Sequence, residues 1–325
     1  MENKRFKTQL RSDTKKRQSF SDWICDGLCE VFLSYLSFED KIRFECVSKQ
    51  FQKSIFNKQF IIEIDEYPNR KENTLNALMN KTNKFNVKAF ESVLKKSKFL
   101  NEVYIRVNNK KFNEIILKLI IKYCYYLKSI AFNFEQISQQ LIEQFGLKFG
   151  QKLSQISFKT TSNSVDKHKK LLRLCPNING FIDGYITDLS IFVGNDSVLV
   201  PKLSKIGLRP ESQDFDYIEN FAKTYGNSLK SVLFEACLRV NDIETNVLMK
   251  QIVYLKSLQK LDLMLEFSAN SSKEFIENLK SIALNCNQLK QLYFFVAETN
   301  PSLDCQIFNC LGFFQKFKSF RIESQ

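Results

Sequence analysis

The chain has 325 residues, more than a single compact core usually organises, so its length predicts either two domains or an elongated repeat body. Hydrophobic residues make up 44% and charged residues 26%, with only 9 Gly and 5 Pro, and this composition excludes a disordered or low-complexity chain. The net charge of +13 admits an anionic partner, but no basic run is interleaved with stacking aromatics in a known nucleic-acid-binding module, so the sequence disfavours nucleic acid.

Residues 1–21 are polar and basic, and we expect them to form a flexible tail. The run Lys15-Lys16-Arg17 could serve as a nuclear import signal, but a solvated tail is the favoured interpretation.

Apolar residues recur at helical spacing along residues 22–56. Ser37 lies where the first amphipathic segment gives way to the second, and we expect it to cap the second helix. A bundle of this length buries little apolar surface by itself, so it should lean on a partner or on the next domain. The first segment carries Leu28, Phe32, Leu33 and Leu36, and the second carries Ile42, Phe44, Val47 and Phe51.

Two sequence blocks in this region carry a resemblance to a known family. They are Leu33-Ser34-Tyr35-Leu36-Ser37-Phe38-Glu39-Asp40 and Val47-Ser48-Lys49-Gln50-Phe51. With this spacing, residues 22–56 resemble the F-box, although Ile24 and Cys25 stand where that family has Leu-Pro. The resemblance implies docking on the Skp-family adaptor of a cullin–RING (SCF-type) ubiquitin ligase. The adaptor contacts it implies lie among Ile24, Leu28, Phe32, Leu33, Leu36, Ile42, Val47 and Phe51.

Residues 57–95 contain a polar, turn-rich stretch at 66–73 between apolar segments, which predicts a packed, ordered linker.

Residues 96–325 repeat a three-point apolar pattern, L-x-x-L-x-L, with a period of 25 to 31 residues. This period is typical of leucine-rich repeats, and we expect about nine copies. Each copy should form a short strand followed by a helix, and neighbouring copies should stack into a curved solenoid. We therefore predict an α/β fold with parallel strands on the concave face and helices on the convex face, including helices near 112–122, 139–149, 216–225 and 272–284. The first positions of the copies are Leu100, Leu127, Leu153, Ile178, Leu203, Leu229, Leu258, Leu289 and Phe317.

Three copies have Cys three residues before the first apolar position: Cys124, Cys175 and Cys286. This placement resembles the cysteine-containing repeats of F-box/leucine-rich-repeat proteins, in which that Cys is structural. The simplest reading of each, a small buried core residue, agrees with the resemblance.

Residues that alternate with the apolar points should face outward and line the concave side, where a protein substrate would bind. The early copies offer polar and basic side chains there, and the late copies offer apolar ones, which could form a contiguous binding patch. The candidate substrate-binding residues are Tyr104, Arg106, Leu233, Asp262, Met264, Tyr293 and Phe295.

Motifs for catalysis are absent from the sequence. We find no Gly-rich phosphate loop, no nucleophile elbow and no CxxC pair, and His168 is the single histidine, so we predict no enzyme activity, no cofactor and no metal site. The 9 Cys are odd in number and no secretory signal opens the chain, which favours a cytoplasmic or nuclear protein with reduced thiols. The most apolar stretch, residues 112–132, carries charges at helical spacing, so we expect no membrane span.

These features favour a non-catalytic substrate-recognition subunit of an SCF-type ubiquitin ligase. Two alternatives remain open. The chain could be an F-box scaffold that binds the adaptor outside a ligase, or a leucine-rich-repeat protein that binds an anionic partner.

Overall fold

The structure is a computed structural model of the chain. It describes residues 26–36, 38–46, 49–57, 61–65, 86–107, 109–158, 164–181, 186, 188–192, 198–209, 215–239, 243–266, 273–296, 307 and 309–324.

Three short helices open the described chain: α2 (Asp26–Ser34), α3 (Phe38–Phe44) and α4 (Lys49–Asn57). Both α2 and α3 pack on α4. The interior between them holds Cys29 and Leu33 of α2 together with Phe51 and Ile55 of α4. The expected cap Ser37 lies outside the described residues.

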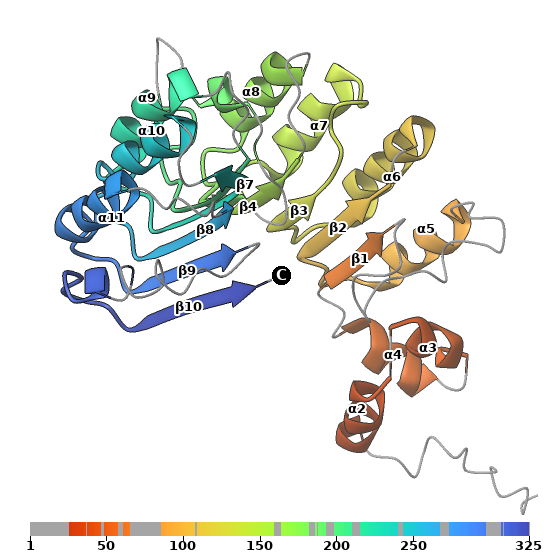
Figure 1. Ribbon diagram of the computed structural model, residues 1–325. Helices are drawn as coiled ribbons and strands as arrows, with labels where there is room; N and C mark the ends of the chain where they lie inside the picture. The colour runs from red at the N-terminus through yellow and green to blue at the C-terminus, as the bar shows by residue number, and fades with distance from the viewer. Residues whose placement is uncertain are drawn as a thin grey trace, which may run out of the picture.

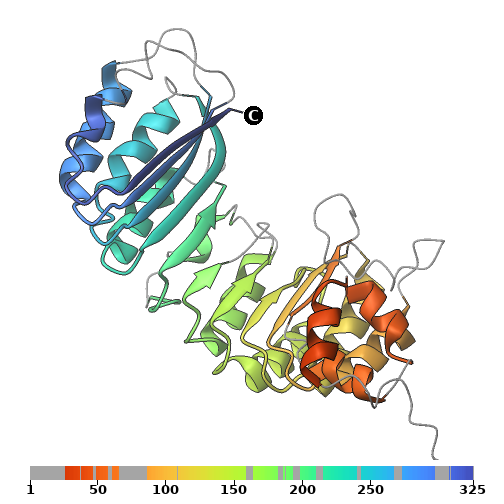
Figure 2. The same cartoon turned by 90° about the horizontal axis from the view of Figure 1, so that it is seen from below.

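The rest of the described chain is an α/β body built on one parallel sheet of ten strands, ordered β1 to β10 as in the sequence. In Figure 1 the strands form an inner arc and the helices an outer arc, which is a solenoid-like arrangement. Figure 2 shows the three N-terminal helices at one end of this curved body. The strands are β1 (Ile61–Asp65), β2 (Glu102–Arg106), β3 (Ser129–Ala131), β4 (Gln155–Ser157), β5 (Gly180–Phe181), β6 (Lys205–Leu208), β7 (Ser231–Arg239), β8 (Lys260–Glu266), β9 (Gln291–Val296) and β10 (Ser319–Ser324). The helices are α5 (Val87–Lys96), α6 (Lys110–Tyr123), α7 (Gln139–Phe149), α8 (Val165–Leu174), the 3-10 helix η4 (Leu189–Ile191), α9 (Phe215–Tyr225), α10 (Ile243–Ile252) and α11 (Lys273–Asn285).

The apolar pattern explains the stacking. Its first positions are buried in every copy from Leu100 to Leu289, whereas Phe317 is only partly buried. The carbonyl of the next residue accepts two backbone N–H groups from the following copy, as Asn101 does from Lys128 (2.7 Å) and Ser129 (3.0 Å). The same pair of hydrogen bonds recurs along the array up to Lys290. Each copy therefore pairs backbone N–H groups of the next copy in addition to burying apolar side chains against it. The helices expected near 112–122, 139–149, 216–225 and 272–284 are confirmed as α6, α7, α9 and α11.

Aromatic side chains fill the space between sheet and helices. Phe158 meets Phe181 edge-on with ring centroids 5.5 Å apart, and Phe181 meets Phe192 at 5.3 Å. Phe192 in turn lies 5.6 Å from Phe221 on α9. This line of rings crosses successive copies and ties them together through edge-to-face contacts.

The sheet begins earlier than the repeat pattern indicates. Strand β1 and all but the last residue of helix α5 lie within residues 57–95, and β1 pairs in parallel with β2 over Ile61–Asp65. Helix α5 also contacts the N-terminal helices, because Lys96 Nζ lies 2.7 Å from Glu45 Oε2 and 5.4 Å from the ring centre of Phe56. The turn-rich segment predicted at 66–73 lies outside the described residues.

The three repeated cysteines follow the last residues of α6, α8 and α11 and are buried. Burial raises the pKa of Cys124, Cys175 and Cys286 to about 12, so these thiols stay protonated and unreactive at neutral pH. They fill space at the end of a helix, as the sequence predicts.

Within the described chain, every helix is too short or too polar to cross a membrane.

Candidate binding surfaces

Helix α2 is apolar on two faces. One face, with Cys29 and Leu33, is buried against α4. The other face carries Leu28, Val31 and Phe32, and Tyr35 directly follows the end of the helix; these four residues are between 53% and 84% exposed. These positions are spaced i, i+3, i+4 and i+7, so they form one continuous stripe on the helix surface. We call this set the α2 stripe.

The structure divides the predicted adaptor contacts into two groups. Leu33 and Phe51 are core residues of the bundle, and Leu36 and Ile42 are partly buried against it. Leu28 and Phe32 are exposed, while Ile24 and Val47 lie outside the described residues. The rings of Phe32 and Phe51 make an edge-to-face contact with centroids 6.2 Å apart, so an exposed ring packs on a buried one.

Val31 and Tyr35 belong to the α2 stripe but were not among the predicted contacts. The apolar residues of 28–36 surround the helix, and sequence spacing alone cannot say which of them α4 covers. Only the contact between α2 and α4 identifies the exposed side.

On the sheet, the parallel register aligns the outward residues of neighbouring strands. Leu233 lies beside Asp262, and Asp262 beside Tyr293. The same row continues to Arg321 on β10. Met264 lies one step further along β8, opposite Phe295, whose side chain is not described. The expected late-strand patch is thus a row of adjacent side chains, although Leu233, Met264 and Tyr293 are each partly buried.

Asp262 is the most enclosed member of this row, with only 8% of the residue exposed. Lys260 Nζ donates a hydrogen bond to its Oδ2 at 2.6 Å and lies 5.1 Å from the ring centre of Tyr293. Burial raises the pKa of the Asp262 carboxyl, and the hydrogen bond from Lys260 acts in the opposite direction. Its Oδ1 has no donor among the described residues.

The outward residues do not form one continuous surface from end to end. Ala131, Ser157 and Gly207 occupy outward positions in the middle of the array and are buried, so the central rows offer little side chain to a partner. Their small size is the physical reason, because such residues do not rise above their neighbours.

At the N-terminal end of the sheet, the two predicted substrate-binding residues, Tyr104 and Arg106, make contacts within the sheet itself. Tyr104 Oη donates to Glu102 at 2.6 Å, and Arg106 lies 3.6 Å from Glu63. The outward face of the early strands therefore carries less positive charge than the sequence of β2 indicates, because Glu63 on β1 neutralises Arg106.

Chemistry beyond binding is not evident in these surfaces. No group of three His, Cys, Asp or Glu side chains suited to a metal ion occurs within the part of the chain that the structure describes. His168, the single histidine, is buried in α8 and does not reach either surface. Comparison with models of protein families gave no match, and comparison with curated proteins gave no significant match.

Proposed function

We propose that this chain is a non-catalytic substrate-recognition subunit of an SCF-type ubiquitin ligase. In this proposal the N-terminal helices dock on a Skp-family adaptor in the manner of an F-box, and the repeat sheet holds a protein substrate. The ubiquitin transfer is done by partner subunits, and this chain contributes proximity.

The observation that carries the proposal is the α2 stripe. A helix of nine residues already uses one apolar face in its own bundle, yet it presents three further large apolar side chains to solvent, and Tyr35 directly after it adds a fourth. Burying a side chain of this kind contributes roughly 1.5–3 kcal/mol, so leaving several of them exposed on one short helix is costly unless a partner covers them. The stripe lies within the segment whose sequence resembles the F-box, and both features favour docking at the same place.

The test is binding of a purified Skp-family adaptor to the full chain. Phe32→Asp introduces a charge into the centre of the stripe and should weaken adaptor binding by at least about 30-fold, the effect of losing a central anchor residue. Isothermal calorimetry measures the dissociation constant, and circular dichroism checks that the variant is folded.

The matched control is Leu147→Asp, because Leu147 is also strongly exposed but lies on α7, away from the N-terminal helices. It should bind the adaptor as the wild-type chain does. Undiminished binding by a folded Phe32→Asp variant would show that the stripe is not the docking surface.

The role of the sheet in this proposal is to hold the substrate through the row Leu233–Asp262–Tyr293. Leu233 and Tyr293, both partly exposed, lie on either side of the Asp262 carboxylate, which is paired with Lys260. That arrangement suits a segment with an apolar residue that packs on Leu233 and Tyr293.

The alternatives differ in what co-purifies with the chain. Adaptor together with cullin supports the ligase subunit, and adaptor alone supports a scaffold outside a ligase. Recovery of neither leaves a repeat protein that binds other partners.

A further inference from the structure

The turns between helix and strand form one long edge of the solenoid, and in the later copies polar side chains bond across it. Asn177 Nδ2 donates to the carbonyl of Gln151 at 2.9 Å, and Ser257 Oγ donates to the carbonyl of Asn227 at 2.9 Å. Lys316 Nζ donates in the same way to the side chain of Gln288. Asn177, Ser257 and Lys316 each directly precede the first apolar position of a copy, so this position stabilises the stacking of neighbours.

The first two copies of the pattern carry aromatic residues at this position instead. Phe99 and Tyr126 directly precede Leu100 and Leu127, and they remain 45% and 55% exposed. Their rings stack on each other with centroids 6.2 Å apart. Since the later copies stack with polar residues here, stacking does not require an exposed aromatic pair. Tyr125, the residue before Tyr126, is also more than half exposed.

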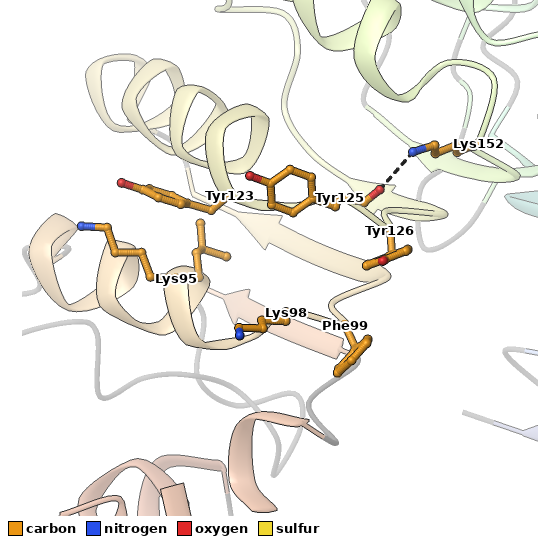
Figure 3. A pocket seen from close by; sticks show the side chains of 8 residues that line it. Lys95, Lys98, Phe99, Tyr123, Tyr125, Tyr126 and Lys152 are labelled. Carbon is orange, nitrogen blue, oxygen red and sulfur yellow. Dashed lines mark hydrogen bonds between the residues drawn. The ribbon is translucent and has the colours of Figure 1, made fainter. Parts of the chain in front are cut away.

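These aromatic residues line a cavity of about 800 Å³ between the ends of α5 and α6. Figure 3 shows Lys95, Lys98 and Lys152 around the same space. We call it the α5–α6 cavity. Its volume is in the range of sites that enclose a small ligand or a few side chains. Its lining residues are Leu94, Lys95, Lys98, Phe99, Tyr123, Tyr125, Tyr126 and Lys152.

Local contacts hold part of this lining in place and leave it positive. Lys152 Nζ donates to the carbonyl of Tyr125 at 3.2 Å, and Lys148 Nζ lies 4.7 Å from the Tyr125 ring centre. Lys95 Nζ forms an ion pair with Glu91 Oε1 at 2.9 Å, and the Tyr123 hydroxyl donates a hydrogen bond to the same oxygen at 2.6 Å. Lys98 and Lys152 add two further positive charges to the lining, which has no acidic residue of its own.

We propose that the α5–α6 cavity binds an acidic protein segment in which carboxylate side chains flank an aromatic or apolar residue. The carboxylates would pair with Lys98 and Lys152, and the apolar residue would pack on the exposed rings of Phe99 and Tyr126. The chain's own residues 1–21 are an unsuitable occupant, because they are basic. The proposal is independent of docking at the α2 stripe, since it concerns different residues on the repeat body.

The extent of the site favours a peptide over a nucleic acid. Single-stranded nucleic acids are held by a basic groove that follows the backbone over several nucleotides. Here the stacked aromatic pair is confined to two adjacent turns. The turn before Ile178 presents Pro176 and Asn177, which are neutral, and Lys202 in the following turn donates a hydrogen bond to Asn177.

The test measures fluorescence anisotropy of a labelled peptide with a central phenylalanine flanked by glutamates, titrated with the full chain. The wild-type chain should bind it, and Lys98→Glu should weaken binding by about fivefold or more. Tyr126→Ser should weaken binding to a similar degree and should also abolish the preference for phenylalanine over alanine at the centre of the peptide.

Each variant has a matched control in the turn before Leu258, far along the array. Lys256 holds the same repeat position as Lys98, and Tyr254 is likewise an exposed tyrosine. Lys256→Glu and Tyr254→Ser should bind the peptide as the wild-type chain does. Equal losses in Lys256→Glu and Lys98→Glu would mean that net charge alone attracts the peptide, which overturns the site.

Two further outcomes also contradict the proposal. Failure of the wild-type chain to bind the peptide removes it outright. Tighter binding of an oligouridylate than of the peptide, with loss in Tyr126→Ser, would reassign the cavity to nucleic acid. Lys98 is exposed beyond the end of α5, so its substitution tests the proposal even if Tyr126→Ser does not fold.

Discussion

His168 is a buried histidine whose ring stacks on that of Phe158, with a distance of 4.2 Å between the ring centroids and an angle of 7° between the ring planes. Neither ring nitrogen has a hydrogen-bond partner among the described residues, and the side chain is fully buried. Burial, with a smaller contribution from Lys167, lowers the pKa of His168 from 6.5 to about 4. The folded protein therefore holds this imidazole neutral at physiological pH.

This pKa predicts a loss of stability in mild acid. Between about pH 6.5 and 4 the unfolded chain binds a proton at His168 that the folded chain does not, so the free energy of unfolding falls as the pH falls. The full effect is about 3 kcal/mol. We expect the urea midpoint of the wild-type chain to drop between pH 7.5 and pH 5, and His168→Leu to reduce that drop.

His168→Leu should be no less stable than the wild-type chain at pH 7.5, because it also removes two buried nitrogens without partners. An equal pH dependence in both proteins would show that other groups, and not His168, cause the acid sensitivity.

At the scale of single elements, the repeat pattern was readable because each copy needs the same buried residues. The leading residues Leu100 to Leu289 are all buried, and a strand begins two residues after each of them. Strand β1 was not predicted because Gln59 stands where the other copies have their leading apolar residue. Its pairing with β2 depends on tertiary contact, which the pattern does not encode.

The candidate surfaces were less predictable than the strands, for a related reason. The α2 stripe depends on which side of α2 meets α4, and the α5–α6 cavity combines residues from two copies. Sequence periodicity indicates the faces of one element at a time. It therefore predicts that Leu233 and Tyr293 face outward from their strands, but it does not indicate that Tyr35 or Tyr126 belongs to a candidate surface.

Glycines at the helix ends set the distance between neighbouring copies. A Cβ atom at Gly150, which follows α7, would lie 1.9 Å from the carbonyl oxygen of Leu174, and one at Gly226 would lie 2.2 Å from that of Tyr254. These are backbone atoms at the end of the next helix, so they cannot move aside as a flexible side chain could. The glycine is required by close approach of two helices.

Gly150→Ala should therefore lower the free energy of unfolding by about 1–3 kcal/mol, the usual cost of overpacking, although alanine is the better helix former. The control is Gly312→Ala, where the nearest atom to the added Cβ would be 3.9 Å away. Urea denaturation should leave that variant close to the wild-type chain. Equal stability of the two variants would mean that the helices can separate without cost.

At the scale of the whole molecule, the strands at the two ends of the solenoid do not pair with each other. Each strand pairs only with the strands before and after it in the sequence, and the strongest contacts between elements join neighbouring copies. In such an array stability is approximately a sum of the copies and the interfaces between them. A change at one end should thus act mainly on its neighbours.

Leu292 and Val103 allow this to be tested at opposite ends, because both are fully buried strand residues, on β9 and β2. Leu292→Ala leaves a cavity that costs about 2–5 kcal/mol. In hydrogen exchange followed by mass spectrometry it should lower the protection of β8 to β10 and α11 while β2 to β4 keep theirs. Val103→Ala should give the reverse pattern, with faster exchange around β1 to β3. Uniform loss of protection along the chain in either variant would show that the copies unfold as one unit, in which case binding at the α2 stripe would be coupled energetically to the far end of the sheet.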